Sequence, residues 1–396
     1  MKPAGAAIQV PDEILEIVNV LEAAGHEAWC VGGALRDALR GEPQSDFDVA
    51  TSAHPEEVRR LFRRTVPVGI AFGTVGVLDR HGGLHEVTTF RKDVSTDGRR
   101  AVVEYGVSLD EDLARRDFTI NAIAFHPITH EWRDPFNGLE DLKQGLLRAV
   151  GAASDRFRED YLRILRLLRF AARFSFRVDP ATWEAAREAV TGLGGLSAER
   201  VRDEWFKSLR TAAKVEDLVR LWHEAGAAPV LLPELTDAEG AASLHVSLAG
   251  ERRDPVMLTI ALCRNPDAVL ERLRASNAEV ARAAAVSAAP AFPADEETAV
   301  RRWLAQVGEA ADDVFILHRL QTGALPPIAD TVQLIRRRAD PLTRSNLAVN
   351  GRDLIEAGIS PGPALGRALD RLLDRVLEDP ALNTRDSLLT LAREID

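Results

Sequence analysis

The stretch VGGALRDALRGEPQSDFDV, residues 31–49, decides how the rest of the chain is interpreted. Gly32 and Gly33 follow a short apolar run and open an expected helix, where unencumbered backbone N–H groups can meet an anion. Asp46 and Asp48 are separated by one residue, so both carboxylates project from one face of an extended segment. Each feature alone is more often a plain turn or a solvated strand edge. Together, within fifteen residues, they predict a phosphate cradle beside a divalent-metal site, as phosphoryl or nucleotidyl transfer requires.

A third carboxylate follows at Glu86. Two strand-like runs, residues 72–79 and 84–90, flank a His-Gly-Gly turn and predict a β-hairpin. The second strand can lie beside the one carrying Asp46 and Asp48, and Glu86 would then complete a metal cluster. The alternative, an ordinary residue on a polar strand face, stays open from the residues alone.

Composition describes an ordinary globular chain with an acidic balance. The 396 residues are 46% hydrophobic and 28% charged, and the length allows more than one domain. The net charge of -11 has the wrong sign for a protein that coats nucleic acid nonspecifically. Contact with nucleic acid must therefore depend on local basic patches, of which the candidates are Arg59/Arg60/Arg63/Arg64, the arginines between Arg156 and Arg177, and Arg336/Arg337/Arg338.

The cellular compartment is inferred from what the sequence does not contain. No apolar run approaches membrane-spanning length, and the first residues carry no secretion signal. Cys30 and Cys263 are too far apart in sequence to indicate a disulfide framework. We therefore expect a cytoplasmic protein with no membrane partner.

The pattern of elements predicts a mixed α/β head followed by helices. Helices are expected at residues 11–25 and 55–62, a strand at 28–31, and a mobile loop over 91–108. Arg115-Arg116-Asp117 with Asn121 offers guanidinium groups for phosphate or ribose. After about Leu147 the strand patterns cease, and helices are expected at 198–209, 214–225, 254–274, 276–288, 296–320, 328–338 and 364–378.

The segment from Arg156 to Phe176 is strongly amphipathic, and Asp160, Arg163 and Arg166 fall on one flank of it at i, i+3 spacing. An Asp-Arg pair on a helix usually forms a surface ion pair. The functional alternative is base recognition, since Asp160 can accept from an exocyclic amine and Arg163 can donate to a ring acceptor. Cytosine and adenine both offer such an amine, whereas uracil and guanine do not offer it there.

These motifs, in this order, resemble the class II tRNA nucleotidyltransferase and poly(A) polymerase family. The motifs that carry the resemblance are Gly32-Gly33-Ala34-Leu35-Arg36-Asp37 with Asp46-Phe47-Asp48, Glu86, Arg115-Arg116-Asp117, Asp134-Pro135 with Gly138, Glu159-Asp160 with Arg163, and Glu199-Arg200 with Glu204. The resemblance implies an α+β fold: a nucleotidyltransferase-type mixed sheet in a catalytic head (1–147), then an all-helical neck for base recognition (148–212), a body (213–310) and a tRNA-binding tail (311–396).

The resemblance also implies roles for single residues. Asp46, Asp48 and Glu86 would be catalytic, and Asp46 and Asp48 would hold two Mg2+ ions. The nucleotide would be bound by Gly32, Gly33, Arg36, Arg115, Arg116, Asp117, Asn121, Asp160, Arg163 and Arg166.

The expected reaction is template-independent addition of CMP, CMP and AMP to the 3′ end of tRNA, from CTP and ATP with release of pyrophosphate. The partners would be the tRNA 3′ end and acceptor arm. The segment between Glu86 and the Arg-Arg-Asp motif is nearly full length, which favours a protein able to add A. A dedicated A-adding or CC-adding enzyme, a bacterial-type poly(A) polymerase and an inactive RNA-binding relative remain as alternatives.

Overall fold

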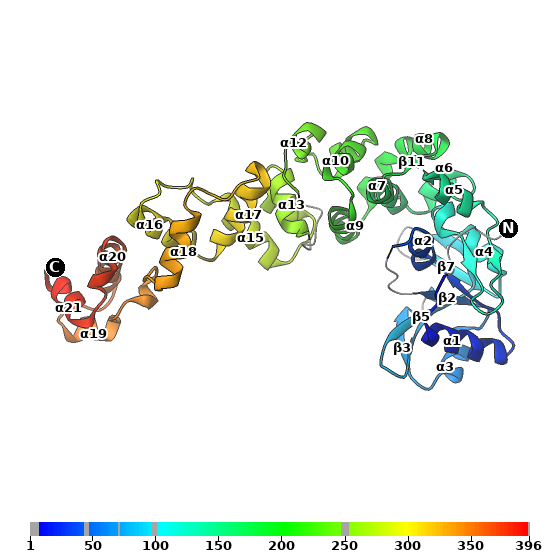
Figure 1. Ribbon diagram of the computed structural model, residues 1–396, viewed down its shortest axis with the longest axis horizontal. Coiled ribbons are helices and arrows are strands. Elements are labelled where there is room, and N and C mark those ends of the chain that lie inside the picture. The colour runs from blue at the N-terminus through cyan, green and yellow to red at the C-terminus, as the bar shows by residue number, and fades with distance from the viewer. Residues whose placement is uncertain (1–7, 43–46, 70–71, 97–100, 247–252, 395–396) are drawn as a thin grey trace. The chain divides into compact units, whose positions relative to one another are not determined.

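The computed structural model describes residues 8–42, 47–69, 72–96, 101–246 and 253–394 (Figure 1). The chain divides into two compact units, residues 1–238 and 239–396. The first unit contains the sheets and the first helices, and the second is helical. The expected α+β fold is therefore confirmed, whereas the finer division into head, neck, body and tail stays a prediction.

A seven-stranded sheet forms the centre of the head, in the order β3-β4-β5-β2-β1-β8-β9. β2 and β5 run parallel, and the other neighbours in this sheet are antiparallel. Its strands are β1 (Ala28–Val31), β2 (Asp48–Thr51), β3 (Thr65–Gly69), β4 (Thr74–Leu78), β5 (Leu84–Thr89), β8 (Ala124–Phe125) and β9 (Trp132–Arg133). The expected strand at 28–31 and the hairpin formed by β4 and β5 are confirmed.

Strand alternation gives this sheet two different faces. Val49, Val75 and Val87 point to one face, where they pack with α1 (Asp12–Ala23) and α3 (Pro55–Leu61) in a buried cluster (Figure 1). The intervening residues, which include Asp48, point to the other face. Over β1, β2 and β8 that second face is covered by α4 (Leu109–Ala114) and by Ala122, which follows the short helix η2 (Thr119–Asn121).

The hairpin of β6 (Arg91–Thr96) and β7 (Ala101–Tyr105) corrects the sequence analysis. The prediction of a loop over residues 91–108 was wrong, because β6 and β7 pair antiparallel in a small sheet of their own. The charged residues at 91–93 suggested a loop, but the valines at 94, 102 and 103 favour strands. Residues 97–100, between the two strands, lie outside the described residues.

Helices follow the head in the first unit. They are α5 (Gly138–Gln144), α6 (Ala153–Glu159), α7 (Leu162–Phe174), α8 (Pro180–Glu188), η3 (Val190–Gly195), α9 (Ala198–Thr211), α10 (Val215–Glu224) and α11 (Ala227–Leu231). One small parallel strand pair, β10 (Leu146–Leu147) with β11 (Arg177–Val178), lies among them. The amphipathic segment 156–176 is two helices, because Asp160 between them is extended, with φ -154° and ψ 103°.

A stack of cationic and aromatic side chains joins α2 (Gly33–Leu39) of the head to α7. The Arg36 guanidinium lies 5.0 Å from the ring centre of Phe170 and 4.9 Å from that of Phe174. Arg40 lies 4.6 Å from the Phe174 ring and 4.9 Å from the Phe176 ring. The stack holds α2 against α7 through the middle and the end of α2.

The second unit contains α13 (Pro255–Leu262), α14 (Pro266–Arg272), α15 (Asn277–Ser287), α16 (Glu297–Val307), α17 (Ala311–Thr322), α18 (Ala329–Arg338), α19 (Gly351–Glu356), α20 (Pro363–Glu378) and α21 (Arg385–Glu394). The helices expected at 254–274 and 296–320 are each two helices. In the first, α13 ends at Leu262, and α14 begins after Asn265, with φ 50°, at Pro266. In the second, Gly308, with φ 60°, follows α16.

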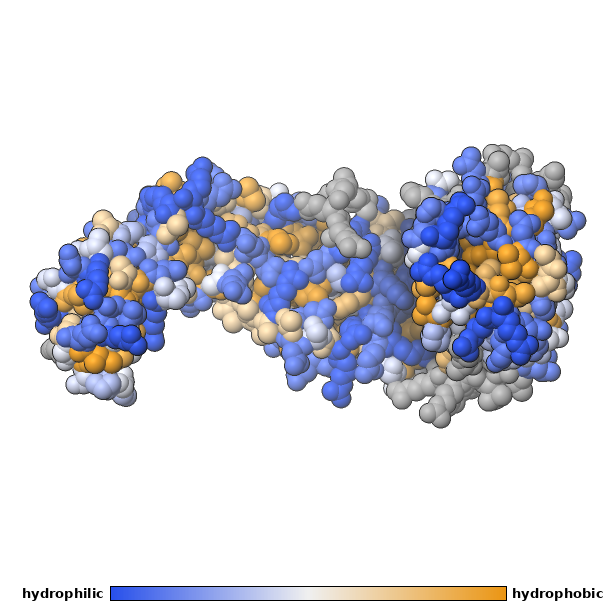
Figure 2. Space-filling view, turned by 90° about the horizontal axis from the view of Figure 1, so that it is seen from below, coloured by the Kyte–Doolittle hydropathy of each residue, from blue (hydrophilic) through white to orange (hydrophobic). Residues whose placement is uncertain are grey.

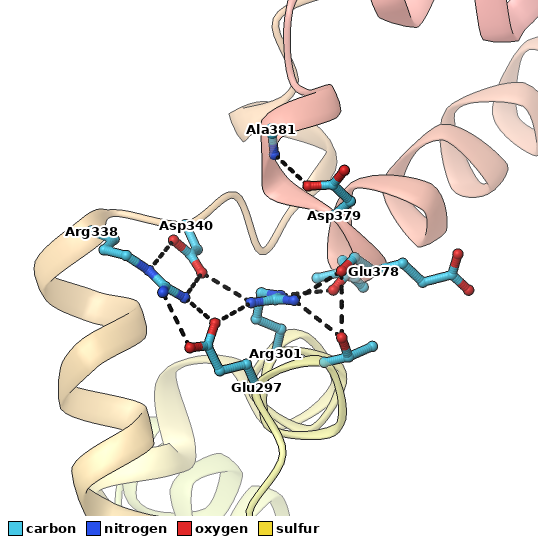
Figure 3. Close-up of polar contacts among 9 residues, drawn as sticks. Glu297, Arg301, Arg338, Asp340, Glu378, Asp379 and Ala381 are labelled. Carbon is cyan, nitrogen blue, oxygen red and sulfur yellow. Dashed lines mark hydrogen bonds and ion pairs between the residues drawn. The ribbon is translucent and has the colours of Figure 1, made fainter.

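A buried arginine connects three helices of this second unit (Figure 3). Arg301 on α16 is 3% exposed and donates to the backbone oxygens of Leu377 and Glu378 at the end of α20. It also pairs with Glu297 and with Asp340, which follows α18. A cation beside the last carbonyls of a helix satisfies unpaired acceptors and is stabilised by the helix dipole.

Hydrophilic side chains predominate on the face drawn in Figure 2, and apolar ones form small separate areas among them. Within the described residues, no helix is both long and apolar enough to cross a membrane.

Candidate active site

A cavity of about 580 Å3 in the first unit brings together most of the predicted site. Its wall comes from the start of α2, from β2, from the segment after α4, and from α7 and α9. The residues that line it are Gly32, Gly33, Arg36, Asp48, Arg115, Arg116, Asp117, Asn121, Asp160, Leu162, Arg163, Arg166, Arg169, Phe170 and Arg200.

Gly32 lies against the carboxylate that the sequence analysis singled out. Its φ of 86° suits glycine, and a Cβ added there would lie 2.8 Å from Asp48 Oδ2 and 3.8 Å from an Arg116 nitrogen. A side chain at this position would therefore fill the space in front of the Asp48 carboxylate. Burial of the thiol, and then the nearby Asp48 carboxylate, raise the pKa of Cys30 to about 12.

The register of the sheet puts Glu86 beside Asp48. β2 and β5 pair with Val49 opposite Val87, so Asp48 and Glu86 precede this pair on the same face. Glu86 is exposed, and it does not line the cavity. Asp46 lies outside the described residues, and the described acidic, histidine and cysteine residues form no group of three suited to a metal.

A hard cation such as Mg2+ prefers oxygen ligands such as carboxylates. The space in front of the Asp48 carboxylate, which a side chain at position 32 would fill, fits such a cation. In this chain the structure supplies the Asp48 carboxylate, the space in front of Gly32 and the neighbouring Glu86 strand position. The three-carboxylate arrangement stays a prediction.

Asp117 is the centre of a buried hydrogen-bond network. Its Oδ1 accepts from the Asn121 side chain at 2.9 Å, and its Oδ2 accepts from Arg166 Nε at 2.8 Å. Asn121 Oδ1 in turn accepts from Arg36 at 2.6 Å. Burial disfavours the charged carboxylate, but Arg166 and the hydrogen bonds outweigh burial and lower the pKa of Asp117 to about 2.

Asp112, which the sequence analysis did not select, orients the neighbouring arginines. It is 1% exposed and pairs with Arg115 at 2.8 Å and with Arg116 at 3.2 Å. Burial raises the pKa of Asp112, but the two guanidinium groups outweigh this effect and leave it below its usual value. The i, i+3 and i, i+4 spacing on a helix was the signal that could have identified this residue.

Asp160 and Arg163 face the cavity from the junction of α6 and α7. Asp160 Oδ1 accepts from the Leu162 N–H, and Asp160 Oδ2 accepts from Arg200 of α9 at 2.7 Å. Arg163 pairs with Glu159 and donates to the backbone oxygen of Arg115 at 3.0 Å. The two side chains therefore contact the rest of the site and do not form an isolated surface pair.

A second pair joins α7 to α9 at the wall of the cavity. Arg169 on α7 is 8% exposed and donates to Glu204 of α9, which is 3% exposed. Arg200 and Glu204 belong to one of the motifs that carry the resemblance. Arg200 contacts Asp160, two residues before α7, and Glu204 contacts Arg169 of α7.

Two of the three candidate basic patches are largely neutralised by partners. Arg336 pairs with Asp312, and Arg338 pairs with Glu297 and Asp340. Between Arg156 and Arg177, carboxylates pair with Arg156, Arg158, Arg163, Arg166, Arg169 and Arg173. The first patch, near α3, consists of exposed arginines.

Family models match most of the chain. Residues 28–148 match the Poly A polymerase head domain, residues 175–239 match the probable RNA and SrmB-binding site of polymerase A, and residues 258–392 match the tRNA nucleotidyltransferase domain 2 (putative). The chain is therefore a nucleotidyltransferase, and the family resemblance is confirmed.

Relatives over the whole length specify the family further. The CCA-adding enzyme of Latilactobacillus sakei is 37% identical, with 96% of this chain and 97% of the relative covered. That of Lacticaseibacillus paracasei is 38% identical, with 96% of each covered. The chain belongs to the CCA-adding enzyme family, whose nucleotidyltransferases depend on metal.

Solved structures agree with this assignment. The Bacillus stearothermophilus CCA-adding enzyme in complex with CTP superimposes with a TM-score of 0.83 at 33% identity, covering 97% of this chain and 96% of that one. The Thermotoga maritima CCA-adding enzyme complexed with tRNA-CCA gives a TM-score of 0.66 at 21% identity, covering 97% and 95%, which supports the fold.

Proposed function

We propose that the chain adds CMP, CMP and AMP in succession to the 3′ end of tRNA, using CTP and ATP and releasing pyrophosphate. The observation that carries this proposal is the convergence of Asp48, the Arg115-Arg116-Asp117 segment and the Asp160/Arg163 pair on one cavity. This arrangement offers a metal-binding carboxylate, cations for phosphate and a base-reading edge in one place. The proposed location of the reaction is the cytoplasm.

Asp46 and Asp48 hold two Mg2+ ions in this proposal. These ions would neutralise the triphosphate and favour loss of the proton from the RNA 3′-hydroxyl. Glu86, on the adjacent strand, assists by ligation or by orienting that hydroxyl. Gly32 and Gly33 leave room for phosphate beside Asp48, where a larger residue would fill the space.

The arginines of the cavity bind the nucleotide's phosphates and ribose. Asp112 orients Arg115 and Arg116, while Asp117 orients Arg166. Anchoring each guanidinium on one side reduces the side-chain entropy that binding would otherwise cost. Asn121 and Arg36, which also line the cavity, continue the network.

Base selection is assigned to Asp160 and Arg163. The carboxylate accepts from the amine of cytosine or adenine, and the guanidinium donates to a ring acceptor. UTP and GTP place a carbonyl oxygen where the amine should be, so an acceptor faces an acceptor and binding is lost. Arg200 and the Leu162 N–H keep the Asp160 carboxylate oriented for this contact.

Three tRNA transcripts test the reaction, ending at the discriminator base, at C and at CC. Each is incubated with CTP, ATP or both, and the products are sized. Growth of the shortest transcript by one complete CCA supports the proposal. Addition of CC alone, or of A alone to the transcript ending in CC, identifies a dedicated enzyme, and open-ended A tracts identify a poly(A) polymerase.

A further inference from the structure

An apolar strip lies exposed on the same sheet face as the catalytic carboxylates. We define it by Val66 and Val68 of β3 and Leu84 of β5, which are 38%, 43% and 44% exposed. Gly76 of β4 lies opposite both Val66 and Glu86 in the sheet register. Residues paired in this way share a face, so the strip continues directly into Glu86.

The strip has a shallow surface because a glycine lies at its centre. A Cβ on Gly76 would lie 2.6 Å from Leu84 Cδ1 and 2.7 Å from Val68 Cγ2, so these two side chains close over the glycine. The result is a continuous aliphatic surface across three strands. Planar apolar groups can lie on such a surface and remove it from water.

The nucleotide cavity lies on the other side of Asp48. Its residues come from β1–α2, the segment after α4, α7 and α9, and none of them comes from β3, β4 or β5. In an in-line displacement the attacking oxygen approaches opposite the leaving group. If pyrophosphate leaves on the cavity side, the RNA 3′ end approaches over Glu86 and β5, where the strip begins.

Pairing of the sheet edge with another strand is not favoured. β3 is the edge strand, but it contains Pro67, and its pairing with β4 is irregular between Val66 and Gly69. Proline and bulges are the devices that keep edge strands from pairing with other chains. We therefore expect a ligand to bind the face of the sheet that carries these exposed apolar residues, and not to pair with its edge strand.

We infer that the strip formed by Val66, Val68 and Leu84 supports the last bases of the acceptor RNA, and this inference rests on the proposed function. Every base has a flat apolar face that can pack on an aliphatic surface, so such packing accepts every base, which suits a 3′ end that changes with each addition. Arg64, exposed at the start of β3, adds a positive charge beside the strip for the RNA backbone.

The test compares Val68→Glu and Leu84→Glu with Val20→Glu. Val20 is 38% exposed on α1, which packs on the opposite face of the sheet, so it is a matched control. We expect the first two variants to raise KM for tRNA by about tenfold and to leave KM for CTP unchanged. An unchanged KM for tRNA, or an equal rise in Val20→Glu, overturns the inference.

Two further readouts separate the possible outcomes. A transcript with a photoreactive thiouridine at its discriminator position should crosslink to the segments 65–69 or 83–86 in the full chain. The inference is overturned if the crosslinks lie only in other segments. It is also overturned if the unaltered chain forms a dimer that Val68→Glu dissociates while KM for tRNA stays unchanged. If the unaltered chain adds no nucleotide to any tRNA, the proposed function itself fails. If all three variants add nucleotides normally, only the inferred role of the strip is rejected.

Discussion

Arginine–carboxylate pairs serve opposite purposes in the two units. In the second unit, Arg301 is buried, and all of its nitrogen atoms have protein partners. In the first unit, Arg115 and Arg166 are each paired with one carboxylate while another part of the side chain lines the cavity. The same chemistry therefore stabilises helix packing in one place and leaves cationic groups available to a ligand in the other.

This difference teaches how to separate a structural cation from a functional one. Burial and ion pairing occur in both units, so neither property identifies a site by itself. What distinguishes the first unit is an open cavity that several partly satisfied guanidinium groups share with a carboxylate. Substitutions in the two units should therefore affect different quantities, activity in one and stability in the other.

The largest expected effect is on catalysis. Asp48→Asn should reduce nucleotide addition by at least about a thousandfold, because several kcal/mol of transition-state charge stabilisation are lost. The melting temperature should change little, since asparagine has the same size. Asp110→Asn, at an exposed pair with Arg133, is the control in single-turnover assays. Retention of more than a few per cent of activity by Asp48→Asn would refute the metal-binding role.

The second effect is on stability. Arg301→Ala should lower the free energy of unfolding of the second unit by about 2–3 kcal/mol, because it leaves the last carbonyls of α20 without their donor. Asp340 also loses this partner, although its pair with Arg338 remains. Hydrogen exchange should show the loss in α16 and α20 and not in the head. Arg302→Ala, at an exposed pair with Glu378, is the neighbouring control. Equal protection of α20 in Arg301→Ala and the unaltered chain would contradict the structural role.

The third effect tests the network at the cavity through pH. The pKa of Asp117 is lowered from 3.8 to about 2, so its charged form stabilises the fold above about pH 4, and this stabilisation disappears as the pH falls to about 2. Asp117→Asn should cost about 2 kcal/mol at pH 7 and progressively less below pH 4. Urea unfolding across this range measures it, with Asp155→Asn as the surface control. A cost independent of pH would exclude the ion pair as its cause.

The smallest effect is on selectivity. Arg163→Ala should reduce the preference for CTP and ATP over UTP by about tenfold, the equivalent of about 1.4 kcal/mol of base discrimination. Competition assays with mixed nucleotides measure this ratio. Arg158→Ala, at the exposed Asp155 pair one turn before the junction, is the control. Unchanged selectivity would show that Arg163 does not recognise the base. Its role would then be the structural contact with Arg115.

Local patterns predicted much of the fold. Alternating residues identified the β4–β5 hairpin, and apolar periodicity identified α1 and most later helices. The pairing of β6 with β7 could not be predicted in this way, because the charged residues among the valines interrupt the apolar pattern typical of a strand. Asp160, the extended residue between α6 and α7, pairs with Arg200, forty residues later, and no local window contains that contact.

The candidate site was predictable as a set of motifs but not as a network. The residue types and their order indicated Asp48, Arg163 and Arg166, and the structure gathers them at one cavity. Contacts between distant segments were not accessible to the sequence, among them Asp117 with Arg166 and Asn121 with Arg36. Such contacts are set by tertiary packing, which local propensity does not encode.

The stack of Arg36 and Arg40 on Phe170, Phe174 and Phe176 has a consequence for protein engineering. A fragment that stops at Leu147 exposes the side of α2 that these rings cover, next to the glycine turn. Chimeras that exchange heads between relatives should therefore transfer α7 as well, because Arg36 and Phe170, which join α2 to α7, are also part of the cavity wall.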